Sequence, residues 1–348
     1  MASFNPDPDY RLMNNQRILL DHGSGGRQSN NLIAEMMLPV FDNPILAGLE
    51  DGAVFEIGGS RLAFSTDTYV VDPIFFPGGS IGDLAINGTV NDIAMCGAEP
   101  QYISAGLIIE EGFAMADLKA VLTDMGRAAQ NAGVQVVTGD TKVVSRGAAD
   151  KIFINTSGIG LIGPGIHISA ANARPGDQIL LSGSIADHGV TILSKRSGLS
   201  FDAPISSDSA PLNRMVAQML RTCPDIHVLR DPTRGGVGTA LNEIASGSGT
   251  GIRIYEDRIP VKQSVSGLCE LLGLDPLYVA NEGKLLAFVD SRHAGAVLSA
   301  MREDPYGRDA VIIGEVVADH PRRVVMETGI GGRRIVDMLS GEQLPRIC

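Results

Sequence analysis

The chain ends on a thiol, because its last residue is Cys348, which follows Pro345-Arg346-Ile347. A cysteine at a chain end contributes little to a hydrophobic core, since chain ends are usually mobile and solvated unless something ties them down. The sulfur of Cys348 therefore has the character of a substrate or a carrier. The alternative, that Cys348 is only the end of a docked terminal strand, stays open at this point.

Three aspartates lie at positions from which strands and helices commonly present ligands, namely Asp67, Asp92 and Asp140. Asp67 and Asp140 are expected near the ends of apolar strands, and Asp92 on the buried face of a helix. A buried carboxylate must be paired, hydrogen-bonded or metal-bound, and carboxylate oxygens completed by water and phosphate suit Mg²⁺. Taken alone, each aspartate is more simply explained as the cap of a turn. The three together favour a magnesium site.

Two glycine-rich segments could bind phosphate groups. Residues 21–27 read Asp-His-Gly-Ser-Gly-Gly-Arg, residues 231–236 read Asp-Pro-Thr-Arg-Gly-Gly, and each precedes a helical pattern. The backbone N–H groups of such a turn, with the dipole of the following helix, can hold an anion. Neither segment is a Walker A loop, and an ordinary turn could explain either. The G-x-G-x-x-G match at 158–163 is followed by Pro164, where a dinucleotide-binding helix would have to begin.

Hydrophobic periodicity predicts the elements that must position these groups. In the first half we expect strands over 61–71, 134–137 and 152–159 and helices over 81–97 and 116–132. In the second half we expect strands over 178–182, 252–255, 284–289, 311–317 and 323–326, and helices over 189–195, 212–220, 237–245 and 265–272.

The order of these elements indicates the fold class. Because strands and helices do not alternate strictly, we expect two α+β domains whose mixed or antiparallel sheets carry helices on one face. The stretch 158–176 is rich in glycine and proline, so neither a helix nor a central strand can cross it uninterrupted. We therefore divide the chain into domains 1–165 and 166–340 and a mobile tail, 341–348.

The composition restricts the partners. The net charge of −12 supplies no basic surface for nucleic acid or an anionic membrane, and no apolar run is long enough to cross a bilayer. The start of the chain has no signal-peptide pattern, so we expect a cytoplasmic location. The four cysteines contain no C-x-x-C pair, which argues against a zinc site of the usual spacing.

Several motifs occur in a fixed order along the chain: the glycine-rich start, Ser-Thr-Asp, Asn-Asp-Ile-Ala, Thr-Gly-Asp-Thr-Lys, Arg-Pro-Gly-Asp, Asp-x-Thr-Arg-Gly-Gly and the final Pro-Arg-Ile-Cys. In this combination the chain resembles the HypE family of hydrogenase maturation factors, from about Ile18 to Cys348. That family belongs to the superfamily of aminoimidazole ribonucleotide synthetase, selenophosphate synthetase and thiamine monophosphate kinase. The resemblance implies PurM-like N- and C-terminal domains that bind ATP.

The resemblance also implies a reaction on the terminal cysteine. The carbamoyltransferase HypF would place a carbamoyl group on the Cys348 sulfur, and the chain would use ATP to dehydrate this S-carboxamide to a thiocyanate. The cyanide would pass to iron on the HypC-HypD complex, for the active site of nickel-iron hydrogenase. A homodimer is expected by analogy. Two alternatives stay open: a small-molecule kinase or synthetase of the same superfamily, and a nucleotide-sensing scaffold without chemistry.

The resemblance assigns roles to individual residues. Asp67, Asp92 and Asp140 would hold Mg²⁺ on ATP. The remaining ATP contacts would come from Asn91, Thr138, Gly23, Gly25, Gly26, Asp231, Thr233, Gly235 and Gly236. A base and a cation are needed within reach of the tail, and we expect Glu282 and Lys142 in these roles. The tail must travel between solvent and the ATP site, so it should be ordered in only one of its states.

Overall fold

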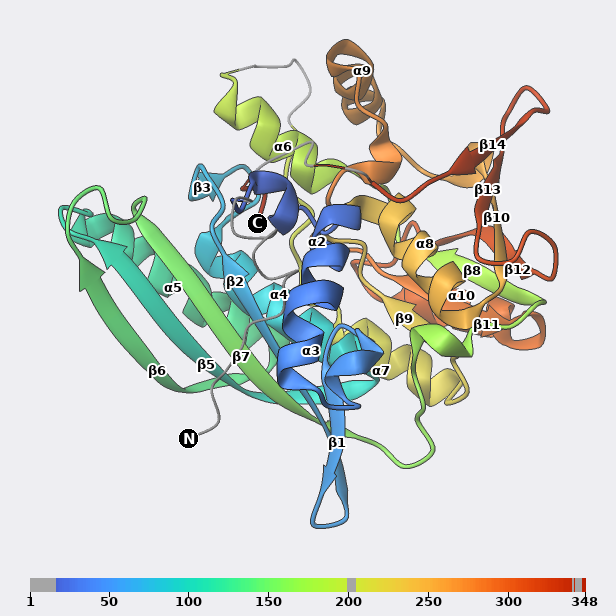
Figure 1. The fold of residues 1–348 in the computed structure, drawn as a ribbon, viewed down its shortest axis with the longest axis horizontal. Coiled ribbons are helices and arrows are strands. Elements are labelled where there is room, and N and C mark those ends of the chain that lie inside the picture. The colour runs from blue at the N-terminus through green and yellow to red at the C-terminus, as the bar shows by residue number, and fades with distance from the viewer. Residues whose placement is uncertain (1–16, 199–204, 340, 342–345) are drawn as a thin grey trace, which may run out of the picture.

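The computed structural model of the chain describes residues 17–198, 205–339, 341 and 346–348. The strands form two separate large sheets, one from each half of the chain, and a small hairpin of β3 (Phe75–Phe76) and β4 (Gly79–Ser80). Figure 1 shows the two sheets side by side, with the C-terminal end of the chain between them, close to β3 and α6 (Asp187–Arg196).

The first sheet has five strands in the order β1-β2-β7-β5-β6. Strands β5 and β6 are parallel and the other neighbours antiparallel, so the sheet is mixed, as expected. Helix α4 packs on β2, β5 and β7, and α5 packs on α4, and no helix of the described residues packs on the other face of the sheet. The bounds are β1 Ala53–Ile57, β2 Ser60–Tyr69, β5 Ala98–Glu110, β6 Gln135–Val144, β7 Ile152–Ile162, α4 Ile81–Met95 and α5 Met115–Ala132.

Besides β1, for which no strand was expected, two strands of this sheet differ from the sequence-based expectation. The interior strand β5 was not expected, because its pairing with β7 shifts register between Pro100 and Tyr102 and this bulge interrupts the alternation of buried and exposed residues. Strand β6 does not end before Asp140 but continues to Val144, so Asp140 lies within the strand. Both differences change where the polar side chains of this domain point.

The second sheet has seven strands in the order β14-β13-β10-β12-β8-β11-β9. Helices lie on both of its faces, in contrast to the first sheet: α8 packs with Ile179 and Phe288 on one face, and α10 packs with Leu180 and Val289 on the other. The bounds are β8 Asp177–Leu181, β9 Val228–Arg230, β10 Gly251–Tyr255, β11 Leu286–Asp290, β12 Val311–Val317, β13 Val324–Glu327, β14 Arg333–Val336, α7 Asn213–Thr222, α8 Gly236–Ser248, α9 Gln263–Leu272 and α10 Ser291–Glu303.

Short helical segments complete the fold. The glycine-rich start leads into α2 (Arg27–Leu32), a π-helical turn (Ile33–Met37) and α3 (Leu38–Phe41), so the helical pattern expected there is confirmed. Single 3₁₀ turns lie at Leu20–Gly23, Leu46–Gly48, Ala170–Asn172, Glu256–Arg258 and Pro276–Tyr278. In the part of the chain that the structure describes, no helix is long and apolar enough to cross a membrane.

The two domains are joined by packing and by polar contacts. Helix α7 packs on α4 of the first domain and on α10 of the second. Asn91 on α4 donates to the Ala210 carbonyl oxygen (3.0 Å) and accepts from the Leu212 N–H (2.8 Å), so its amide is used to hold the domains together. The connection between the sheets runs from Ile162 to Asp177 and contains our division after residue 165, which stays a prediction.

Candidate active site

The C-terminal residues lie between the two domains and are held by their backbone. Three consecutive carbonyl oxygens of the tail each accept a hydrogen bond from a different part of the body. Cys348 O accepts from Val70 N (2.9 Å), Ile347 O from His188 Nε2 (2.7 Å), and Arg346 O from Arg196 Nη2 (2.8 Å). Cys348 is only 5% exposed. The structure therefore shows the tail in a docked state, with its sulfur buried.

The Cys348 sulfur faces a cation. Arg234 Nη1 lies 3.2 Å from Sγ and donates to it. Burial nevertheless raises the pKa of the thiol to about 12, with the opposing charge of Arg234 outweighed by burial and by the negative charges of Glu282 and Asp67. An exposed cysteine has a pKa of about 8.5. The docked sulfur is therefore a neutral thiol, which needs release or chemical modification before it can react.

This shift in pKa predicts how tail docking depends on pH. The stabilisation contributed by the neutral thiol is complete below the ordinary pKa of about 8.5 and is lost as the pH rises towards about 12. The alkylation of Cys348 by iodoacetamide, followed by mass spectrometry of the C-terminal peptide, should therefore keep accelerating between about pH 8 and 10. A plateau near pH 9 would show instead that the sulfur is solvated.

Glu282 is buried beside the sulfur and carries an unsatisfied oxygen. It precedes β11, and its N–H is fixed by Asp208 Oδ1 (3.1 Å). Among the described residues its Oε1 has no hydrogen-bond partner, although the residue is only 4% exposed. Burial raises the pKa of Glu282, and the charges of Asp67 and Asp208 raise it further. A carboxylate with a raised pKa is a stronger proton acceptor than an exposed one, as a general base requires.

Further carboxylates gather around the same point from both domains. Asp67 lies on β2, Asp92 on α4 and Asp231 directly after β9. Burial raises the pKa of Asp92, and the charges of Asp231 and Asp67 add to this, while Ser65 Oγ donates to Asp92 Oδ2 (2.7 Å). Burial also raises the pKa of Asp231 to about 6 against the opposing charge of Arg230. Repulsion among buried carboxylates is what a bound cation relieves.

A fourth acid of this cluster, Asp51, was not found from the sequence. It precedes β1, and its Oδ1 lies 2.9 Å from Arg230 Nη1 of the second domain. Burial raises the pKa of Asp51 despite this ion pair, and the charges of Asp231 and Glu243 contribute. The only signal in the sequence was the turn-forming pair Asp51-Gly52, which is too common to single out.

Asp140 does not join this cluster within one chain. Asp67 on β2 pairs with Thr156 on β7, Thr156 pairs with Ala105 on β5, and Ala105 pairs with Gly139 on β6. Gly139 therefore lies three strands from Asp67, about 14 Å at the ordinary spacing between strands. Asp140 follows Gly139, and successive side chains of a strand point to opposite faces. Asp140 therefore lies on the face without helices. A magnesium ion bound by Asp67, Asp92 and Asp140 of the same chain is excluded by this geometry.

Thr138 and Lys142 share the face of Asp140, because they lie two residues before and after it on β6. Lys142 Nζ forms an exposed ion pair with Asp140 (2.7 Å), and this pairing lowers the pKa of Asp140. Neither residue lies near the tail in the same chain. The cation expected next to Cys348 is present, but it is Arg234 rather than Lys142.

The glycines of the two expected phosphate loops meet at Arg234. Gly25 has a φ of +76°, and a Cβ atom there would lie 3.0 Å from the Arg234 Cβ, so only glycine allows this close approach. The Gly25 and Gly26 N–H groups donate to Ser29 Oγ and Ser24 Oγ within their own loop. Among the described residues, no atom lies within 4 Å of a Cβ position on Gly23, in the preceding 3₁₀ turn.

The second loop forms a tight turn into α8. Gly235 and Gly236 both have positive φ (+77° and +61°), and a Cβ on Gly236 would lie 2.5 Å from the Leu277 carbonyl oxygen. The Thr233 N–H donates to the Asp231 carbonyl oxygen (3.0 Å), and the Gly236 N–H to the Thr233 carbonyl oxygen (2.9 Å). The turn fixes the backbone that presents Asp231 and Arg234.

The carboxylates of this cluster meet some of the requirements of a magnesium site. Carboxylates are the ligand type that Mg²⁺ prefers, and burial raises the pKa of Asp92 and of Asp231, which a bound cation would lower. In the ranges that the structure describes, however, no three Asp, Glu, His or Cys groups converge closely enough to hold a metal. An ion here would take most of its ligands from water and phosphate.

Comparison with known proteins gives the family. The N- and C-terminal domains of AIR synthase related proteins match residues 49–162 and 174–327. The carbamoyl dehydratase HypE of Azotobacter vinelandii is 55% identical over 336 residues, which cover 97% of this chain and 98% of that protein.

Two solved structures are similar over most of the chain. A crystal structure of a HypE-HypF complex matches with a TM-score of 0.85 and 48% identity, covering 88% of this chain and 99% of that one. A crystal structure of the hydrogenase maturation protein HypE in complex with ATP matches with a TM-score of 0.81 and 55% identity, covering 95% and 100%. The chain therefore belongs to the HypE family of carbamoyl dehydratases, enzymes of hydrogenase maturation built from the two AIR synthase related domains.

Proposed function

We propose that this chain uses ATP to dehydrate an S-carboxamide on its own Cys348 to a thiocyanate, which supplies cyanide for the iron of nickel-iron hydrogenase. One observation carries the proposal: the Cys348 sulfur is docked against Arg234, beside the unsatisfied carboxyl of Glu282 and the acidic cluster. The names of its relatives and the ATP-bound HypE structure support it.

The chemistry requires an activated oxygen and the removal of two protons. ATP supplies a phosphoryl group that turns the carboxamide oxygen into a phosphate leaving group. The products are the thiocyanate, ADP and phosphate, and both protons of the carboxamide nitrogen leave. Glu282 Oε1 is the acceptor that we assign to the first of these protons, because it is buried next to the sulfur and has no competing partner among the described residues. The second proton leaves with the departing phosphate. Arg234 holds the sulfur and stabilises charge that develops beside it.

ATP and Mg²⁺ would be held by both domains. Asp67 and Asp92 from the first domain and Asp231 from the second would take the metal, with phosphate and water as its other ligands. The loops that contain Gly25 and Gly235 would face the phosphates. Thr138 and Asp140 of the same chain lie too far away on β6, so a role for them requires a second chain.

A homodimer along β6 would provide this second chain. Strand β6 is at the edge of the first sheet, and nine of its ten residues are exposed, including Val136, Val137 and Val143. An exposed apolar edge strand is a template for pairing with another strand. Asp140 and Lys142 would then lie at the interface and approach the partner's site. We expect Val137→Asp to convert the dimer to a monomer in sedimentation velocity; a wild-type monomer would contradict the arrangement.

The reaction also requires the tail to leave its docked position. The docked sulfur is buried, so HypF can add the carbamoyl group, and HypC-HypD can accept the cyanide, only after the tail is released. A solved HypE-HypF complex supports the first partner. A cytoplasmic location suits this exchange and is testable by cell fractionation.

Intact-mass spectrometry tests the proposed function directly. After treatment with HypF and its substrates, the chain should gain one carbamoyl group, and addition of MgATP should then remove the mass of one water. Cys348→Ala should show neither change. An adduct that persists with MgATP would refute the dehydratase proposal.

The same assay tests the metal site. Asp92→Asn should keep the carbamoyl adduct but lose the ATP-dependent dehydration, because the amide weakens the ligand and cannot neutralise the ion. Ser65→Ala is a matched control, since it removes the hydroxyl that bonds Asp92 Oδ2 and the Asp51 carbonyl oxygen but keeps the Asp92 carboxylate. Full dehydration by Asp92→Asn would remove this aspartate from the site.

A further inference from the structure

The backbone oxygen of Ile347 in the docked tail is bound by His188, a residue that has no role in the proposed reaction. His188, the second residue of α6, is fully buried, and its Nε2 lies 2.7 Å from the Ile347 oxygen. A carbonyl oxygen can only accept, so Nε2 carries the proton. The other ring nitrogen, Nδ1, then accepts from Ser207 Oγ at 2.8 Å. Both nitrogens of a neutral ring are satisfied, and one of the two bonds is made to the tail.

The His188 ring is fixed in this orientation. Phe76 packs against it edge-on, with ring centroids 5.6 Å apart and planes at 87°. Burial lowers the pKa of His188, against the opposing charge of Asp208, so the ring stays neutral. The donor to the tail is therefore present before the tail arrives.

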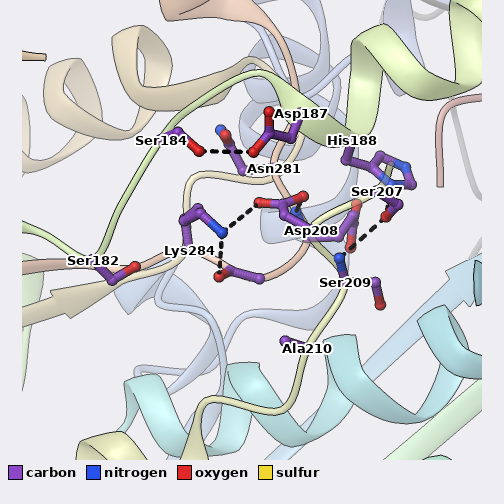
Figure 2. A network of polar contacts seen from close by, with 12 residues as sticks. Ser182, Ser184, Asp187, His188, Ser207, Asp208, Ser209, Ala210, Asn281 and Lys284 are labelled. Atoms are coloured by element: carbon purple, nitrogen blue, oxygen red, sulfur yellow. Dashed lines mark hydrogen bonds and ion pairs between the residues drawn. The ribbon is translucent and has the colours of Figure 1, made fainter. Parts of the chain in front are cut away.

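His188 and the backbone of Glu282 are held by one polar network. Figure 2 shows its members His188, Ser207, Asp208 and Lys284. Ser207, which donates to His188, is followed by Asp208, whose Oδ1 accepts from the Glu282 N–H (3.1 Å). Asp208 is itself anchored by Lys284 Nζ, 3.3 Å from its Oδ2. The adjacent residues Ser207 and Asp208 thus connect His188, which binds the tail, with the backbone of Glu282, the expected base.

A second connection runs from the start of α6. Asn281 Oδ1 accepts from the Ala186 N–H (2.8 Å), and the Gly189 N–H donates to the Ala280 oxygen (3.1 Å). Residues 280–281 immediately precede Glu282. Two connections therefore fix the position of His188 relative to Glu282, one through Ser207 and Asp208 and the other through residues 280–281.

We propose that His188 is a positioning residue: its hydrogen bond to the Ile347 carbonyl sets the register of the tail, so that the Cys348 sulfur stops between Arg234 and Glu282. The docking part of this inference stands on the contacts alone. Its effect on dehydration rests on the proposed function.

Alkylation of Cys348 in the full chain measures docking without ATP. His188→Asn should raise the rate of Cys348 alkylation by iodoacetamide about tenfold, because the docked Ile347 carbonyl loses its donor. His188→Gln is the matched variant. The amide nitrogen of glutamine can reach the position of His188 Nε2, whereas the asparagine side chain is too short to do so. We expect His188→Gln to stay within about twofold of wild type. Equal rates in wild type and His188→Asn, or equal acceleration in both variants, would overturn the proposal.

Single-turnover dehydration of the carbamoylated chain gives the second readout. His188→Asn should slow the loss of water about tenfold with an unchanged KM for ATP, because only the tail is misplaced. If the wild-type chain loses no water, the proposed function fails, while the alkylation result still decides the role of His188. A lowered ATP affinity with normal tail docking would contradict the positioning role.

The buried Cys96, Cys223 and Cys269 report whether a variant stays folded. If they become reactive in His188→Asn, Ser207→Ala decides instead, because it keeps the ring but removes the partner of Nδ1. Ser207→Ala should accelerate Cys348 alkylation severalfold, and an unchanged rate would overturn the proposal.

Discussion

Glu282→Gln is expected to slow the loss of water from carbamoylated Cys348 by about a thousandfold, within the usual contribution of a general base. Glutamine has nearly the same size and shape, but its amide cannot accept a proton. The raised pKa of Glu282 also fixes the sign of the pH dependence. Dehydration in wild type should fall as the pH drops through a value above the ordinary glutamate range, and Glu282→Gln should lose this acid limb. Rapid-quench mass spectrometry at several pH values measures both.

The control for this prediction is a glutamate of the second domain that lies outside the site. Glu315 is half-buried in the second sheet, where it accepts from Tyr255, and Glu315→Gln should leave dehydration unchanged. A Glu282→Gln chain that dehydrates at the wild-type rate would show that another group takes the first proton.

Arg234→Met is expected to reduce the dehydration rate about a hundredfold, the order of magnitude lost with one preorganised donor at a reacting centre. Methionine keeps the Cβ on which Gly25 packs, but it offers neither charge nor donor to the sulfur. Single-turnover mass spectrometry gives the rate. Arg234→Lys should recover only part of it, because an ammonium group cannot reproduce the fixed geometry of a guanidinium.

Arg258→Met is the matched control for Arg234→Met. Arg258 is exposed and stacks on Tyr255, 4.2 Å from the ring centroid, away from the tail. Its replacement should leave the rate unchanged. Normal dehydration by Arg234→Met would place the stabilising cation elsewhere, and Lys142 of a second chain would then be the next residue to replace.

The sequence predicted elements best where one local pattern was strong. Helix α5 was predicted almost to the residue, because its apolar period is regular and Gly133 ends it in a left-handed conformation (φ +77°). Strand β5 was missed, since Pro100 and the bulge beside it break the alternation that identifies a strand. The α+β class and the mixed first sheet are confirmed, whereas helices on both faces of the second sheet depend on packing between segments far apart in the chain.

The candidate site shows the same division. Motifs identified Cys348 and Glu282, and the structure brings these two together. They could not show on which face of a strand Asp140 lies, because that depends on the register of four strands. Arg234 was overlooked within its own motif, since its importance comes only from the distant tail that folds onto it.

The hydrogen bonds that hold the tail determine where an affinity tag can be placed on this enzyme. They are made to successive carbonyl oxygens up to that of Cys348 itself, which accepts from Val70. One residue added before the cysteine would displace the sulfur from these contacts by up to about 3.6 Å, the reach of one residue. Affinity tags belong at the N-terminus, because a tag fused to the C-terminus would convert an end group into a mid-chain residue between the two domains.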